Sequence, residues 1–303
     1  MSNKSLSVIV FVIFVLQLVV SCTCNRTNTN KDEFDIPDSI RTGALPVSEN
    51  VMQEMVGNIS SPIEMASLMK SLGVPFSQKY MATTKNVSGY NTSYAKAFNL
   101  GIFGADLGYL NMYGKTSLVL DYITAMKTLA DGINVGQFFD FTTLKRLATN
   151  NQNIDSLVYI SQQSFNRMDK YLQKNNRGNL SALMVAGVWT EGLYLSTQFL
   201  KERPNERLAE SIGEQKIILN QLMIILRNYQ NEKYIADLIT DMEGIKKLYD
   251  EVRITIEVGE PQAVEVDGRL TIIQTETSTV HYTEELMNNI INQAEAIRNK
   301  LIK

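Results

Sequence analysis

The sequence predicts an all-α fold: an irregular multi-helix bundle of antiparallel helix hairpins with a small β-hairpin near the C-terminus. Three observations support this prediction. Apolar residues recur at intervals of three and four over most of the chain from residue 50 onward. The breaks between these stretches carry Asn, Gly or Pro, which end helices and favour turns. One stretch, about 254–280, instead alternates apolar and polar residues.

The first 21 residues are typical of an export signal. Lys4 lies in a short polar start, and the run from Val8 to Val20 is apolar except for Gln17. This run is too short for a spanning helix, which needs about 20 residues. Because Cys22 follows the small residue Ser21, we expect a lipoprotein signal in which the Cys22 thiol is acylated. The alternative is an ordinary signal peptide that leaves Cys22 unmodified.

Residues 22–48 predict a flexible tether, because they are rich in Asn and Thr, contain Pro37 and Pro46, and show no apolar period. The remaining residues, 49–303, predict one helical domain. Its expected helices cover about 50–59, 62–72, 92–113, 116–130, 138–147, 154–174, 180–201, 206–229, 232–252 and 283–303, with a loop over 73–91. An array of helical repeats is an alternative, but no unit recurs at a fixed spacing.

The alternating stretch predicts two strands on either side of Asp267-Gly268, a pair typical of tight hairpin turns. Ile254, Ile256 and Val258 alternate with polar residues in the same way. The segment Thr275–Thr279 is polar and rich in threonine, so a strand and a flexible loop are both possible there.

Composition argues against several classes of function. The formal net charge is −3, and no basic run is longer than Lys246-Lys247, so nucleic acid is not an expected partner. Two cysteines and one histidine do not make a thiolate or imidazole metal cluster. Neither a phosphate-binding loop nor a dinucleotide fingerprint is present, and no cofactor is expected. His281 stands without a Gly-x-Ser-x-Gly motif, which argues against a serine hydrolase triad.

Two predicted helices carry stripes of small residues. Glycine inside a helix costs about 1 kcal/mol relative to alanine, so three glycines within eight residues require a reason. Close packing of two helices is one explanation, and a gap for a ligand is the other. The first stripe consists of Ala97, Gly101, Gly104, Ala105 and Gly108, and the second consists of Ala182, Ala186 and Gly187.

Three carboxylates lie inside apolar helical stretches: Glu64, Asp106 and Glu191. An ionised carboxylate is costly to bury unless it is paired or hydrogen-bonded. Each therefore either has a structural partner or belongs to a site that uses paired carboxylates as acid and base. Clustering of the three around an open pocket would favour an enzyme or a ligand site, and dispersed ion pairs would favour a structural role.

Three strings, at residues 61–64, 97–107 and 187–194, resemble a family of Bacteroides-type lipoproteins that has no assigned activity. The resemblance covers about residues 60–199. It implies an outer-membrane lipoprotein, and it raises Ser39, within Asp38-Ser39-Ile40, as a possible O-glycosylation site. A second such pattern at Asp155-Ser156 also suits the first turn of a helix.

Together these features predict a lipid-anchored envelope protein that acts as a non-enzymatic helical binding or adaptor module. We expect it to face the periplasm from the outer membrane, with the cell surface as the alternative location. Its expected partners are the membrane, through lipidated Cys22, and an envelope protein or small ligand. The alternatives are an envelope hydrolase or lyase that uses the buried carboxylates and a ligand-binding lipoprotein of an outer-membrane uptake system.

Overall fold

The computed structural model describes residues 62–148, 154–266, 269–273 and 276–302. Its contacts divide the chain after Asp32, and all described residues belong to the second unit. The predicted signal, the tether and the expected helix over 50–59 lie outside the described residues.

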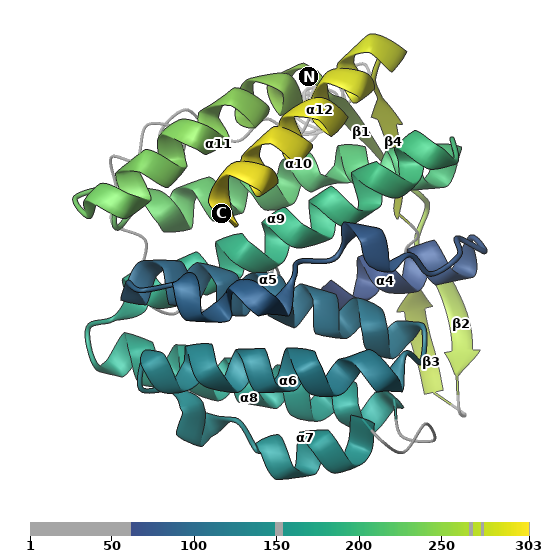
Figure 1. The fold of residues 1–303 in the computed structure, drawn as a ribbon. Coiled ribbons are helices and arrows are strands. Elements are labelled where there is room, and N and C mark those ends of the chain that lie inside the picture. Colours follow the sequence, from purple (N-terminus) through teal and green to yellow (C-terminus); the bar gives the residue numbers. More distant parts are fainter. Residues whose placement is uncertain (1–61, 149–153, 267–268, 274–275, 303) are drawn as a thin grey trace, which may run out of the picture. The chain divides into compact units, whose positions relative to one another are not determined.

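Helices dominate the described chain, as the apolar periodicity predicts (Figure 1). Three short 3-10 helices join them, namely η1 (Gln78–Tyr80), η2 (Thr84–Gly89) and η3 (Gly136–Phe138). The α-helices are α4 (Pro62–Ser71), α5 (Ser93–Met112), α6 (Thr116–Gly132), α7 (Phe141–Ala148), α8 (Ile154–Lys174), α9 (Gly178–Glu202), α10 (Glu206–Arg227), α11 (Lys233–Glu251) and α12 (Glu284–Leu301).

The helix ends are set by residues that the sequence already marks. Thr92, Asn205 and Thr283 cap α5, α10 and α12 by accepting a backbone N–H with their side-chain oxygens. Gly73 and Gly114 follow α4 and α5 with φ of 69° and 65°, a left-handed conformation that glycine adopts without strain. These local signals explain why most predicted helix bounds differ from the observed ones by only one or two residues.

Two predicted connections differ from the structure. The sequence predicts a helix from residue 138, but α7 begins at Phe141, because the Asp140 side chain accepts the Thr143 N–H at 2.9 Å and starts the helix there. The predicted loop over 73–91 contains η1 and η2.

The β insertion is confirmed and is longer than one tight hairpin. Strand β1 (Arg253–Val258) pairs with β4 (Glu276–His281), with Arg253 opposite His281. Strand β2 (Gln262–Val266) pairs with β3 (Arg269–Ile273) across the predicted Asp-Gly turn, whose two residues lie outside the described chain. A strand rather than a loop therefore follows residue 275.

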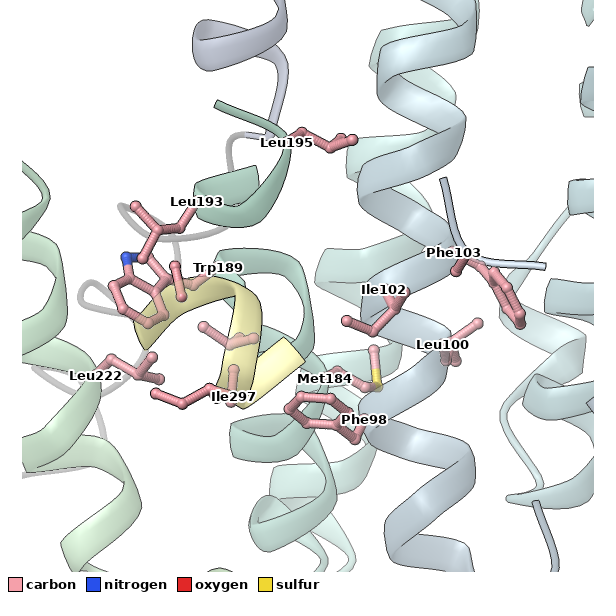
Figure 2. Packing of buried hydrophobic residues seen from close by; sticks show 14 of the residues in the cluster. Phe98, Leu100, Ile102, Phe103, Met184, Trp189, Leu193, Leu195, Leu222 and Ile297 are labelled. Carbon is pink, nitrogen blue, oxygen red and sulfur yellow. The ribbon is translucent and has the colours of Figure 1, made fainter. Parts of the chain in front are cut away.

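Helices α5 and α9 lie at the centre, with α6, α7 and α8 on one side and α10, α11 and α12 on the other (Figure 1). Trp189 of α9 faces Leu222 of α10 and Ile297 of α12, whereas Met184 lies beside Phe98 of α5 (Figure 2). Helix α9 is therefore apolar on opposite sides because it packs on both, as its sequence predicts. No helix in the described part of the chain combines the length and apolarity that crossing a membrane requires.

Consecutive helices pack together, as in a bundle of hairpins, but the central pair runs in parallel. Gly101 lies against Met184, and eight residues further along α5 the ring of Tyr109 lies 5.8 Å from that of Phe199. Contacts thus advance in the same direction along both helices. Because α5 and α9 are not consecutive in the chain, no short turn forces them to be antiparallel.

Candidate functional site

The structure brings together two of the three predicted carboxylates. Asp106 on α5 and Glu191 on α9 are both 0% exposed, and their carboxyl groups lie within hydrogen-bonding reach of each other. Glu64 lies on α4, but its side chain is outside the described part of the structure. Among the described side chains, the site is therefore a pair of carboxyl groups without solvent-exposed surface.

Arg298 of α12 forms a bidentate ion pair with Glu191. Its Nε lies 2.9 Å from Oε2 of Glu191, and its Nη2 lies 2.9 Å from Oε1. Nη2 also donates to the Tyr80 carbonyl at 3.1 Å, and the guanidinium lies 4.4 Å from the centre of the Tyr194 ring. Parallel N–H donors that match both carboxylate oxygens form a strong, directional contact, so both oxygens of Glu191 are already engaged.

Asp106 is held on one oxygen only. Its Oδ2 accepts the Ala82 N–H at 2.9 Å, whereas its buried Oδ1 faces no N–H or O–H donor among the described residues. Buried polar atoms normally have a hydrogen-bond partner. Since Oδ1 and the Glu191 carboxylate are both acceptors, a proton between the two groups would provide the missing interaction.

Burial raises the pKa of Asp106 well above its ordinary value, and the adjacent Glu191 charge raises it further. Burial also raises the pKa of Glu191, but the Arg298 guanidinium opposes that rise. Burial therefore favours the neutral form of Asp106, whereas the charge of Glu191 is stabilised by the Arg298 guanidinium.

The segment that covers this pair is residues 73–92, which we call the strap. Arg298 and Asp106 bind its backbone at Tyr80 and Ala82. Tyrosine hydroxyl groups fix the strap at further points: Tyr113 donates to the Val74 carbonyl at 2.7 Å, Tyr109 accepts the Ser77 N–H at 2.8 Å, Tyr122 donates to the Ala82 carbonyl at 2.6 Å, and Tyr90 donates to the Ile302 carbonyl at 3.2 Å.

The two small-residue stripes meet on the same helix pair. A Cβ atom on Gly101 would lie 2.0 Å from the Met184 carbonyl oxygen, and one on Gly187 would lie 2.0 Å from the Phe98 carbonyl oxygen. Gly104 faces the ring of Phe165 on α8 instead. Close packing therefore explains these three glycines, and the space that they leave is filled by protein rather than open to a ligand.

The other two predicted site residues, Cys22 and Ser39, lie outside the described residues. His281 ends β4, where its Nε2 lies 3.1 Å from Thr255 Oγ1. Across the described part of the chain, no three His, Cys, Asp or Glu side chains gather in a way that would hold a metal ion.

Sequence reasoning missed Arg298 and the tyrosines that hold the strap. A signal for Arg298 exists, because it continues the apolar stripe of α12 formed by Ile290, Ile291, Ala294 and Ile297. A charged residue on a buried helix face implies a buried partner of opposite charge. The tyrosines carry no such signal, since their backbone partners belong to a segment without helical or strand periodicity.

Comparison with known proteins adds no relative. No family model, curated protein or solved structure matches the chain. The site must therefore be interpreted from its own chemistry. In the structure, Asp106 and Glu191 have no solvent-exposed surface.

Proposed function

We propose that this protein is a lipid-anchored envelope protein whose helical domain acts as a non-enzymatic binding or adaptor module. The anchor rests on the sequence, in which a cationic start, a 13-residue apolar run and a small residue precede Cys22. Stable membrane attachment takes more than one lipid chain, and a triacylated cysteine would satisfy that need. We place the protein at the outer membrane, facing the periplasm.

The observation that supports a non-enzymatic role is the complete burial of Asp106 and Glu191. These were the strongest candidates for acid–base chemistry, and in the structure their oxygens are used to hold Arg298 and the strap. The alternatives, a hydrolase or lyase that uses these carboxylates and a ligand-capturing lipoprotein of an uptake system, would both need a site that opens.

The anchor is tested by Cys22→Ser, with Cys24→Ser as the matched control. We expect labelled palmitate to enter the native protein and the Cys24→Ser variant, and both to sediment with membranes. The Cys22→Ser variant should take up no label and should leave the membrane fraction. Palmitate labelling that persists in Cys22→Ser, or its absence from the native protein, would contradict the proposal.

The adaptor role is tested by mild crosslinking in intact envelopes followed by affinity capture. We expect the native protein to recover one envelope protein reproducibly, and the unanchored Cys22→Ser variant to recover less of it. Recovery of no reproducible partner would count against an adaptor. Hydrolysis of an envelope polymer by the purified protein, lost in Asp106→Asn, would instead favour the enzyme alternative.

A further inference from the structure

One contact in the hydrogen-bond network around Asp106 and Glu191 has no hydrogen to donate. Five polar contacts surround the pair: two from Arg298 to Glu191, one from Arg298 to Tyr80, one from Ala82 to Asp106 and the mutual contact of the carboxyl groups. Only the mutual contact lacks a donor. Asp106 Oδ1 is buried and has no hydrogen-bond donor among the described residues, so this oxygen is available for the contact with Glu191.

The groups that face the pair from neighbouring elements do not supply a second positive charge. Tyr122 approaches from α6, Tyr80 and Tyr90 from the strap, Tyr109 from α5 and Tyr194 from α9, and burial raises the pKa of each phenol. A phenol carries no positive charge in either protonation state, and burial favours the neutral form of these five side chains.

Among the side chains that the structure describes, few charged groups lie near the pair. Arg298 on α12 is the cation that the structure places against it. Asp121, Glu202 and Glu295 act on the surrounding tyrosines and lie nearer the surface. All three are acidic, so they do not favour a second negative charge on the pair.

We propose that Asp106 and Glu191 hold one shared proton in the folded protein, and that this proton keeps the strap closed over the core. In this arrangement Asp106 Oδ1–H donates to Glu191, while Asp106 Oδ2 accepts the Ala82 N–H and Glu191 balances Arg298. Transfer of the proton to water or hydroxide leaves two carboxylates in a sealed volume. Hydration relieves that repulsion, and the pair gains access to water when the strap moves away.

The strap is the segment that we expect to move. Its backbone contacts the pair and Arg298 directly, so a change in the charge of the pair acts on the strap first. The Ala82 N–H and the Tyr80 carbonyl bridge directly to Asp106 and Arg298, whereas α5, α9 and α12 are continuous helices. The strap contains only the short η1 and η2. Segments with little regular structure open at a lower free-energy cost than packed helices.

The sign of the pH dependence follows from where the proton is bound. The ordinary pKa of an aspartate side chain is 3.8, and burial beside Glu191 raises the pKa of Asp106 in the closed protein. The closed state therefore binds more protons than the open state at pH values between these two pKa values. The stabilisation of the closed strap is complete below about pH 3.8, weakens as pH rises, and is lost as pH passes the pKa of the closed pair.

The test compares the native protein with Asp106→Asn, because asparagine is nearly the same shape as a protonated aspartate and does not titrate. Hydrogen exchange of the strap amides, corrected for the intrinsic pH dependence of exchange, is measured over a pH series. We expect native protection to fall by up to about tenfold per pH unit as pH rises. Protection of the same amides in Asp106→Asn should not change with pH.

Asp169→Asn is the matched control, since Asp169 is also a buried aspartate but binds Ser181 on α9, away from the strap. It should retain the native pH dependence. Equal pH dependence in the native protein and in Asp106→Asn, or strap protection that rises with pH, would overturn the proposal.

Infrared spectroscopy provides a second measurement that does not depend on a variant remaining folded. The native protein at neutral pH should show the carbonyl stretch of a protonated carboxylic acid, and titration to alkaline pH should remove it. Absence of that band from the native protein at neutral pH would also overturn the proposal. Neither measurement depends on the lipid anchor or the adaptor role, so the two proposals can fail separately.

Discussion

Helices α5 and α9 meet in two different ways along one interface. At Gly101 and Gly187 they touch backbone to backbone, and further along at Asp106 and Glu191 they touch through buried carboxyl groups. The first contact is complete with two helices. The second also requires Arg298 from α12 and the strap backbone. Packing of small residues is thus a property of the pair, whereas the polar contact depends on four segments of the chain.

The largest effect is expected at the polar contact. Arg298→Met keeps the volume of the side chain but leaves Glu191 buried without its counterion, so the free energy of unfolding should fall by about 3–5 kcal/mol. Urea denaturation followed by circular dichroism measures this change. Arg227→Met is the control, because its pair with Glu243 is partly exposed and should contribute about 0–1 kcal/mol. Equal losses in both variants would mean that Glu191 becomes neutral at little cost when Arg298 is absent.

The next largest loss of unfolding free energy is expected from a substitution at the glycine contact between α5 and α9. A Cβ atom on Gly101 would also lie 2.8 Å from the Val188 nitrogen, and backbone atoms cannot turn aside as a flexible side chain can. Gly101→Ala must therefore separate the helices, and we expect a loss of about 3 kcal/mol. Thermal or urea denaturation checks this value.

Gly192 provides the matched control on α9, since a Cβ atom there would meet nothing within 4 Å. Gly192→Ala should stabilise the protein by about 0.5–1 kcal/mol, because alanine favours the helix. If Gly101→Ala were also stabilising, the backbone contact between α5 and α9 would be wrong.

Smaller losses of stability are expected when single hydrogen bonds between the strap and the helices are removed. Tyr122→Phe removes the hydroxyl that binds the Ala82 carbonyl and should cost about 1–2 kcal/mol, with faster hydrogen exchange around residue 82. Tyr113→Phe removes a similar bond to Val74, at the start of the strap. It should accelerate exchange there and leave Ala82 protected. Uniform acceleration along the strap in both variants would show that the strap opens as one unit.

The sequence predicts most of the fold because the signals are local. Threonine and asparagine caps, left-handed glycines and apolar periodicity set the helix ends, and alternation finds the β insertion. The contacts of Gly101 and Gly187 agree with close helix packing, one of the two explanations that the small residues allow. The parallel direction of α5 and α9 does not follow from local signals, because it depends on which distant helices meet.

The candidate site is predictable only in part. Burial of Asp106 and Glu191 follows from their apolar neighbours in the sequence. Their association with each other and with Arg298, which lies 107 residues beyond Glu191, requires the three-dimensional structure. The strap anchors at Tyr80 and Ala82 are backbone groups, which no side-chain pattern identifies.

The position of Arg298 on α12 has a consequence for biosynthesis. Arg298 is synthesised 107 residues after Glu191, so Glu191 exists for a time without its guanidinium partner. Until then, the two central helices have no counterion for the acidic groups between them, and their docking is penalised. If the chain is exported, as we propose, a late counterion would keep the central helices apart for longer and so favour passage across a membrane before folding.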